Sequence, residues 1–258
     1  MDSKIQFIPH EKDDMDFFDD VTDGLDQKLL TEQIFIGQVK TQAPFILEFI
    51  DENLTLHHQP TEQSYAVNFN RGKVFHRIFF DPTKTMLVKA IEGRSKEKLN
   101  IIDATAGFGS DLFQLASRGH DIIAIERNLI VYLLLRDALF RAEDNPQTHP
   151  ITQHITLLYG DAVDLISRYS EHSDIIYLDP MFPQSKKSAK VQKEMQILQT
   201  LHHDNHDNQW NNEQLFNIAT QSANKVVVKR PASGPYLNEK KPSSSLTGKS
   251  NRFDIYAR

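Results

Sequence analysis

Residues 100–119 read NIIDATAGFGSDLFQLASRG and are the part of the chain that is most informative about its fold. The apolar run NIID is typical of a short strand that ends at Asp103. A turn of small residues follows, in which Gly107 and Gly109 allow the backbone to approach a ligand closely. The next segment has helical spacing and closes at Gly119. The G-x-G-x-x-G spacing of dinucleotide-binding turns is absent, so the turn is either an ordinary tight connection or a different nucleoside site.

Strands and helices alternate regularly downstream of this turn. We expect further strands at residues 121–126, 155–161, 174–180, 226–230 and 253–257, and helices at 128–142, 162–170 and 190–203, with an exposed polar loop over 202–212. This alternation predicts an α/β domain over residues 81–258, Rossmann-like, with a mostly parallel sheet and helices on both faces. Such sheets place ligand sites at the carboxyl ends of their strands.

Residues 1–80 are expected to form an acidic N-terminal segment and a small subdomain. Aspartate is dense up to about residue 30, as in DDMDFFDD at 13–20, and we predict a partly ordered segment there. Short strands or hairpins are expected in the four apolar stretches that follow, which are IFIGQV, FILEFI, LTLHH and YAVNF. A helix is expected to start at Asp81-Pro82-Thr83 and to continue through KTMLVKAI.

Composition excludes several classes of protein. The chain has 258 residues, 39% hydrophobic and 25% charged, which is enough for a sizeable core. It has no cysteine, so disulfides, thiolate catalysis and cysteine-ligated metals are excluded. An apolar run of about 18 residues and a signal peptide are both absent, so we expect a cytoplasmic location and no membrane partner.

The net charge of −6 is unevenly distributed. Residues 1–180 carry 17 Lys and Arg against 29 Asp and Glu, whereas residues 181–258 carry 12 against 6. A basic C-terminal segment on an acidic protein indicates a localised contact with a polyanion, because phosphate binding depends on clustered charge. The alternative is that these lysines and arginines solvate helix faces.

Acidic and small residues follow three successive strands. Asp103 opens a turn that resembles methyltransferase motif I, with Thr105 in place of the first glycine. Glu126 ends the second strand, where a carboxylate can accept hydrogen bonds from both ribose hydroxyls. Asp161 can accept from an adenine amino group, and Ala162 leaves room for the ring. Together these sites favour a nucleoside cofactor without phosphates, and S-adenosylmethionine fits better than NAD or ATP.

The fourth strand ends in Asp179-Pro180-Met181-Phe182, which resembles the [DNS]-P-P-[YFW] motif of amino-methyltransferases. An exocyclic base amine is a poor nucleophile because its lone pair is delocalised into the ring. Asp179 and the Pro180 carbonyl can accept its two N–H bonds, and Phe182 can stack on the base. An Asp-Pro turn without chemistry is the alternative.

Basic residues follow this motif and end two later strands. We expect RNA phosphate contacts from Lys186, Lys187, Lys190, Lys229, Arg230 and Arg252, or else a solvated surface. Three histidines at 202, 203 and 206 lack a clear carboxylate scaffold, so we expect no metal site.

Five strings resemble one known family. DATAGFGSDLF, AIERN, YLDPMFPQSKKSAKVQKEMQ, VVVKRP and RFDIY are similar to the ribosomal small subunit methyltransferase J (RsmJ) family, from about residue 65 to the C-terminus. The resemblance implies a class I S-adenosylmethionine-dependent methyltransferase that modifies guanine N2 in 16S rRNA. It also implies cofactor contacts at Ser110, Asp111, Glu126, Arg127, Asp161, Ala162 and Asp179.

The expected partner is therefore 16S rRNA or the small ribosomal subunit, bound by a monomer. Two other hypotheses remain open. The chain could methylate an amine on another nucleic acid or a protein, or it could be a non-catalytic RNA-binding protein of ribosome assembly.

Overall fold

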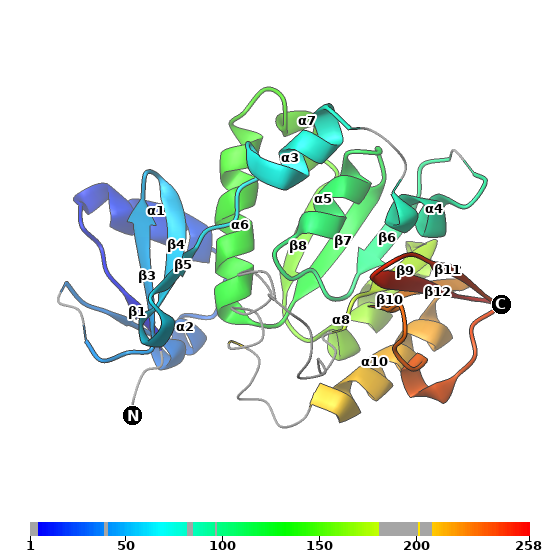
Figure 1. Cartoon of the computed structure of the whole chain (residues 1–258). Coiled ribbons are helices and arrows are strands. Elements are labelled where there is room, and N and C mark those ends of the chain that lie inside the picture. Colours follow the sequence, from blue (N-terminus) through cyan, green and yellow to red (C-terminus); the bar gives the residue numbers. More distant parts are fainter. Residues whose placement is uncertain (1–4, 39–40, 82–84, 96, 181–200, 202–207) are drawn as a thin grey trace.

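The computed structural model describes residues 5–38, 41–81, 85–95, 97–180, 201 and 208–258 (Figure 1). These residues form a seven-stranded sheet and a five-stranded sheet. The larger sheet contains β6 (Asn100–Asp103), β7 (Asp121–Glu126), β8 (Ile155–Tyr159), β9 (Ile175–Leu178), β10 (Lys225–Pro231), β11 (Ser244–Thr247) and β12 (Asn251–Ala257). The helices that accompany it are α3 (Gly72–Phe79), α4 (Met86–Glu92), α5 (Ser110–Ala116), α6 (Leu129–Glu143), α7 (His149–Thr152), α8 (Ala162–Tyr169) and α10 (Asn208–Ser222). Two single turns of 3-10 helix, η2 (Ser170–His172) and η3 (Leu237–Glu239), complete this part.

The strand order of the larger sheet is β11-β12-β10-β9-β6-β7-β8. Neighbours from β10 through β8 run parallel, and β12 is antiparallel to both β10 and β11. The prediction of a mostly parallel sheet is thus confirmed. It succeeded because β6 to β10 are separated by helices, and a crossover of that length returns a strand in the same direction.

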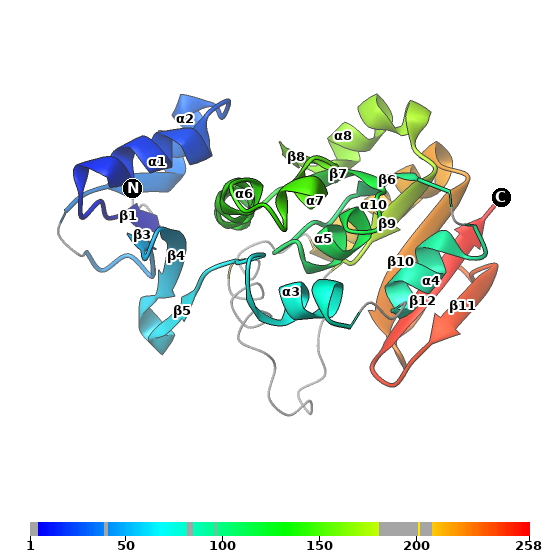
Figure 2. The ribbon, with the colours of Figure 1, turned by 90° about the horizontal axis from the view of Figure 1, so that it is seen from above.

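Helices cover both faces of this sheet (Figure 2). Ile101 and Ile175 point to the core that contains α4, α5 and α6, whereas Ile102 and Ile176 point to the core that contains α8 and α10. Adjacent residues of a strand therefore bury their side chains on opposite faces of the sheet, which explains why the strand sequences are continuously apolar.

The five-stranded sheet has the order β2-β1-β3-β4-β5. Its strands are β1 (Ile5–Phe7), β2 (Ile34–Ile36), β3 (Phe45–Ile50), β4 (Asn53–His58) and β5 (Gln63–Tyr65), with helices α1 (Lys12–Thr22) and α2 (Gln27–Gln33) and the 3-10 turn η1 (Gln59–Thr61). The strand expected at YAVNF, residues 65–69, is not formed: β5 ends at Tyr65, and residues 66–69 belong to no strand.

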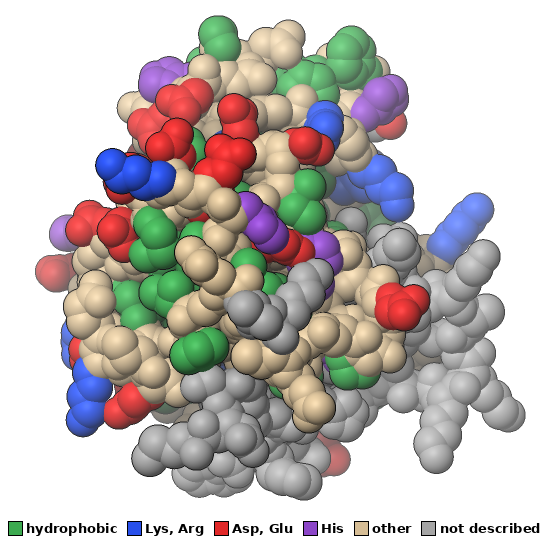
Figure 3. Space-filling model, turned by 90° about the vertical axis from the view of Figure 1, so that its left-hand side faces the viewer, with side chains coloured by type: hydrophobic (Ala, Val, Ile, Leu, Met, Phe, Trp, Pro, Cys, Tyr) green, Lys and Arg blue, Asp and Glu red, His purple; other side chains and the backbone are tan. Residues whose placement is uncertain are grey.

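The first 30 residues are more regular than the acidic pattern predicted. Phe7 of β1 stacks on Phe18 of α1, with ring centroids 4.0 Å apart. Four apolar residues of β1 and α1 enter the core, namely Ile5, Phe7, Phe18 and Val21. The aspartates of α1 are exposed except Asp14, which is buried, so the acidic composition masks an amphipathic helix. Asp and Glu side chains gather on this side of the molecule (Figure 3).

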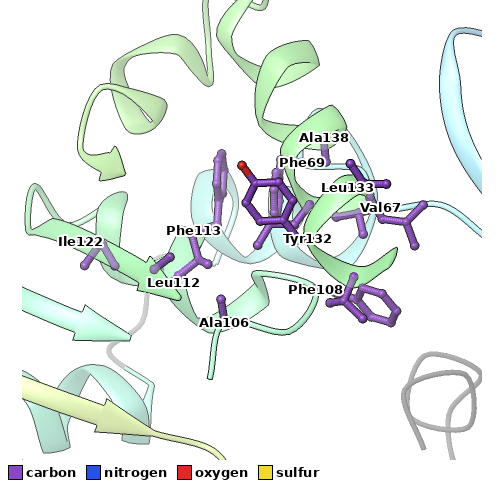
Figure 4. Packing of buried hydrophobic residues seen from close by; sticks show 14 of the residues in the cluster. Val67, Phe69, Ala106, Phe108, Leu112, Phe113, Ile122, Tyr132, Leu133 and Ala138 are labelled. Atoms are coloured by element: carbon purple, nitrogen blue, oxygen red, sulfur yellow. The ribbon is translucent and has the colours of Figure 1, made fainter. Parts of the chain in front are cut away.

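Helix α6 lies between the two sheets (Figure 1). The Leu54 amide of β4 donates to the Asp137 carboxylate of α6 at 3.2 Å. The connection from β5 packs on the other side, where Phe69 stacks on Phe113 of α5 at 4.1 Å (Figure 4). The division of the chain at residue 80 stays a prediction, because α3 precedes it and yet packs against α5.

Several local predictions differ from the structure. Helix α4 begins at Met86, because the Thr85 hydroxyl caps it by accepting from the Val88 amide at 3.3 Å. Helices α3 and α7 and strand β11 were not predicted, and residues 208–212 belong to α10 rather than to a loop. The helix expected over 190–203 lies outside the described residues except at Leu201. Within the described part of the chain, the helices are all too short or too polar to cross a membrane.

Candidate functional site

Charged side chains meet where the parallel strands of the larger sheet end. Asp103 ends β6, Glu126 ends β7, and Asp179 follows β9 directly. The register of β10 with β9 makes Lys229 the neighbour of Asp179. Four residues that are far apart in the sequence are thus brought to one edge of the sheet, as the alternation of strands and helices predicted.

The two glycines of the turn after β6 have different neighbours. Both have positive φ, +54° at Gly107 and +77° at Gly109. A Cβ on Gly109 would lie 2.5 Å from Leu135 Cδ1 and 2.9 Å from Phe69 Cζ. A Cβ on Gly107 would meet nothing closer than the Thr105 carbonyl oxygen at 3.9 Å. Gly109 therefore accommodates the core of the protein, whereas Gly107 leaves the space in front of the turn open.

Glu126 holds this turn in place. Its carboxylate accepts from the Gly107 amide at 2.9 Å and from the Asn128 amide at 2.7 Å. The residue is 5% exposed, and burial raises the pKa of its carboxyl group. Each carboxylate oxygen has a second lone pair, so the group can still accept from a ligand hydroxyl.

Lys229 joins two carboxylates. Its Nζ lies 2.8 Å from Asp111 Oδ2 and 2.8 Å from Asp179 Oδ2. The Tyr177 hydroxyl also donates to Asp111 Oδ2, at 2.7 Å. We refer to Asp103, Asp111, Tyr177, Asp179 and Lys229 as the carboxylate cluster. One cation thus neutralises part of a group of three acids at the strand ends.

Burial raises the pKa values of the carboxyl groups in the cluster, whereas the Lys229 ammonium lowers them. Burial raises the pKa of Asp103 to about 8, and the nearby Asp111 and Asp179 charges add to the rise. Burial also raises the pKa of Asp179, although the Lys229 ammonium limits that rise. For Asp111, burial is outweighed by Lys229 and by the Tyr177 hydrogen bond, and the pKa is lowered. The pKa of Lys229 is raised despite its burial, because both carboxylates stabilise the ammonium.

Thr105 and Tyr177 have supporting roles that were not predicted from the sequence. The Asp179 amide donates to Thr105 Oγ1 at 2.6 Å, and the Thr105 amide donates to Asp103 Oδ1 at 3.1 Å. Thr105 thereby couples the turn after β6 to the end of β9. One signal was available for Tyr177: it precedes Asp179 by two residues, so the strand period places both side chains on the same side.

The other predicted cofactor residues lie around this edge. Asp161 caps α8, with Oδ1 accepting from the Val163 amide at 2.9 Å. Its Oδ2 lies 3.8 Å from Arg127 Nη1, and Ala162 is buried at the start of the helix. Ser110 begins α5, directly before Asp111. These residues are near the strand ends as expected, and their contacts with a cofactor stay predictions.

The basic residues predicted to bind RNA are engaged within the chain where the structure describes them. Lys229 belongs to the carboxylate cluster, and Arg230 donates to the Pro235 carbonyl at 3.1 and 3.0 Å. Arg252 pairs with Asp254 at 2.8 Å. Phosphate contacts by these three residues stay a prediction. Phe182, Lys186, Lys187, Lys190 and the three histidines at 202, 203 and 206 lie outside the described residues.

Among the residues that the structure describes, no group of three or more His, Asp or Glu has the arrangement of a metal site. In the carboxylate cluster, Lys229 contacts two of the three acids, Asp111 and Asp179. The groups that the structure places at this edge are carboxylates, one ammonium group and backbone amides.

Comparisons with known proteins agree with this architecture. A family model described as "Putative SAM-dependent methyltransferase" matches residues 30–258. Ribosomal RNA small subunit methyltransferase J of Francisella tularensis subsp. novicida is 42% identical over 239 residues, 92% of this chain and 96% of that protein. The protein of the same name from Francisella philomiragia is 41% identical over 211 residues, 81% of this chain and 86% of that one. The crystal structure of a SAM-dependent methyltransferase from Neisseria gonorrhoeae has a TM-score of 0.76 and 25% identity, and the match covers 98% of this chain and 95% of that one. The chain therefore belongs to the ribosomal RNA small subunit methyltransferase J family of S-adenosylmethionine-dependent methyltransferases.

Proposed function

We propose that this chain transfers a methyl group from S-adenosylmethionine to the exocyclic N2 amine of a guanine in 16S rRNA of the small ribosomal subunit. The relatives at 42% identity are named as methyltransferases of small subunit ribosomal RNA. The observation that supports amine methylation is the position of Asp179 at the end of β9. Lys229 contacts its carboxylate, and its backbone amide donates a hydrogen bond to Thr105. The Asp179 carboxylate is therefore held in place as a hydrogen-bond acceptor for the N–H groups of an amine.

The residues at the strand ends fit S-adenosylmethionine. The open space at Gly107 allows the ligand to approach the backbone, and the Glu126 carboxylate below it can accept from ribose hydroxyls. Asp161 and Ala162 lie at the next strand end, where the adenine would bind. When bound, the cofactor supplies an electrophilic methyl group.

Asp179 and Pro180 would orient the acceptor amine. The Asp179 carboxylate and the Pro180 carbonyl accept its two N–H bonds, which favours a pyramidal nitrogen with an accessible lone pair. Lys229 keeps the Asp179 carboxylate in one orientation through the 2.8 Å contact. Burial raises the pKa of Asp179, which suits a group that receives the proton the amine loses. We assign Phe182 to stacking on the base and Lys186, Lys187 and Lys190 to phosphates that flank it.

We also propose that the protein acts as a monomer in the cytoplasm, where small subunits are assembled. Its substrate is then rRNA, free or within the subunit. Because transfer between sulfur and nitrogen needs no Lewis acid when the amine is oriented and deprotonated by Asp179, we propose a reaction without a metal.

The test is methyl transfer from labelled S-adenosylmethionine to small-subunit rRNA and to assembled small subunits from cells that lack the protein. Nucleoside mass spectrometry then identifies the product. We expect N2-methylguanosine with the wild type and at least a hundredfold slower transfer with Asp179→Ala. Asp174→Ala is the matched control, because Asp174 precedes the same strand at its other end.

Each alternative hypothesis has a distinct outcome. Cofactor binding without transfer to rRNA or subunits would direct the search to an amine on another nucleic acid or a protein. Lack of saturable S-adenosylmethionine binding, with rRNA binding retained, would favour a non-catalytic assembly protein. Near-normal turnover of Asp179→Ala would remove Asp179 from the catalytic role.

A further inference from the structure

Helix α3 exposes an unusual number of aromatic side chains. Val74 and Ile78 pack against the core, while Phe79 and Phe80 lie on the exposed side, and Phe80 is 68% exposed. Phe75 is 4.6 Å from Phe79 and 6.2 Å from Phe80 between ring centroids. A cluster of large apolar side chains exposed to solvent commonly marks a binding surface, because soluble proteins rarely expose such clusters otherwise.

Helix α3 and its N-cap residue also carry positive charge. Arg71, Lys73 and Arg77 are exposed, and within the described part of the chain none of them forms an ion pair with a carboxylate. The rest of the protein up to residue 180 is strongly acidic, so these cations stand out as a local basic site. Their charge is complementary to a polyanion.

Three cations and two aromatic rings line one pocket of about 660 Å³, together with His76, Asn70, Gly72 and one acidic residue, Asp81. We call it the α3 surface and define it by Arg71, Lys73, Phe75, His76, Arg77 and Phe80. Base stacking on aromatic rings combined with phosphate contacts is typical of proteins that bind single-stranded nucleic acid.

The α3 surface is close to the carboxylate cluster. Arg77 is near enough to Asp111 for its charge to help lower the pKa of that carboxyl group, although burial opposes the effect and Lys229 contributes more. Helix α3 also packs against α5, which begins next to Asp111. An RNA strand on this surface would therefore lead towards Asp179.

We propose that the α3 surface binds the single-stranded rRNA that flanks the target nucleotide. Phe80 stacks on a base, and Arg71 and Lys73 contact phosphates. This inference rests on the proposed function for the identity of the RNA, and on the exposure and charge of α3 for the site itself.

The experiment measures binding of the full-length protein to small-subunit rRNA and to assembled small subunits from cells that lack it, at several salt concentrations, together with methyl transfer to both. The variants are Phe80→Ala and the double variant Arg71→Gln/Lys73→Gln. The matched controls are Phe17→Ala, which removes another exposed phenylalanine, and Lys12→Gln/Lys28→Gln, which removes two exposed lysines on α1 and α2. Arg77 is left unchanged because of its proximity to Asp111.

We expect Phe80→Ala to weaken rRNA binding roughly tenfold, as for other stacked bases. Arg71→Gln/Lys73→Gln should reduce the slope of log K against log[salt] by about 1.4, since each lost phosphate contact on a single strand accounts for about 0.7. The controls should bind rRNA like the wild type, and every variant should keep its affinity for S-adenosylmethionine, which shows that the fold is intact.

Wild-type binding and methylation of rRNA by both α3 variants would overturn this inference and leave the proposed function standing. Weakened binding by the variants without any methyl transfer by the wild type would support the α3 surface and refute the proposed function. A defect seen solely with assembled subunits, with normal binding to free rRNA, would overturn the inference in favour of a ribosomal protein as the partner of α3.

Discussion

Replacing Lys229 with methionine tests whether one ammonium group holds the carboxylate cluster together. The variant keeps a similar side-chain length and removes the positive charge from between Asp111 and Asp179. Both contacts of 2.8 Å are lost at once. Two carboxylates that shared a cation would then repel each other at the strand ends.

The magnitude follows from the burial of the three side chains. Removing one partner of a fully buried ion pair costs about 3–5 kcal/mol. Here Lys229 and Asp111 are each 22% exposed and Asp179 is 37% exposed, so water screens part of the repulsion. We therefore expect a loss of about 2–3 kcal/mol, a decrease in Tm of about 5–10 °C for a chain of this size.

The pH dependence distinguishes this mechanism from a simple loss of packing. In the wild type the lowered pKa of Asp111 stabilises the fold above its unfolded pKa, and this stabilisation is lost as the pH falls through the folded pKa. Without Lys229 the pKa of Asp111 should rise, so the variant is least stable where the cluster is ionised. The Tm difference between variant and wild type should therefore be larger at pH 8 than at pH 5.

The assay is thermal unfolding followed by circular dichroism at both pH values. Lys225→Met is the matched control, because Lys225 lies on the same strand and donates to the Ile91 carbonyl instead of a carboxylate. Its Tm difference should not depend on pH in this range. A Lys229→Met protein that melts with the wild type, or whose Tm difference is the same at pH 5 and pH 8, would refute the reasoning.

Three further predictions concern the turn and its neighbours. Glu126→Gln should weaken S-adenosylmethionine binding about tenfold to a hundredfold in calorimetric titration, because a charge-assisted acceptor is lost; unchanged affinity would contradict its role. Because the pKa of Asp103 is raised to about 8, the wild type should lose stability as the pH rises from about 4 towards 8, and Asp103→Asn should flatten that profile in urea unfolding. A parallel profile would show that Asp103 is not protonated in the folded state. Gly109→Ala should destabilise the fold by about 2–4 kcal/mol, because its Cβ would overlap Leu135 at a positive φ, whereas Gly107→Ala should cost about 1 kcal/mol from the backbone alone. Equal costs in urea unfolding would contradict the packing argument.

A mostly parallel sheet, and the edge of it at which charged residues gather, could be predicted from the amino-acid sequence. Strands β6 to β10 are continuous apolar runs separated by helices, and this local pattern leaves one direction and one edge for their carboxyl ends. Asp103, Glu126 and Asp179 could be placed at that edge because each follows a strand directly. Helix α3 was not predicted, because only Val74 and Ile78 follow the helical spacing of core residues. The exposed phenylalanines beside them obscure that spacing.

The partners of these side chains depend on how the elements pack in three dimensions. From the sequence, Lys229 was predicted to be one of several basic residues that contact RNA. In the structure, the register of β10 against β9 places it between Asp111 and Asp179. These residues are 118 and 50 positions away from it in the sequence. From the sequence, Thr105 was interpreted as a substitution for a motif glycine. Because the turn after β6 crosses the end of β9, the Thr105 hydroxyl accepts a hydrogen bond from the Asp179 amide. Pairing of this kind depends on distances between elements, and no local pattern in the chain encodes those distances.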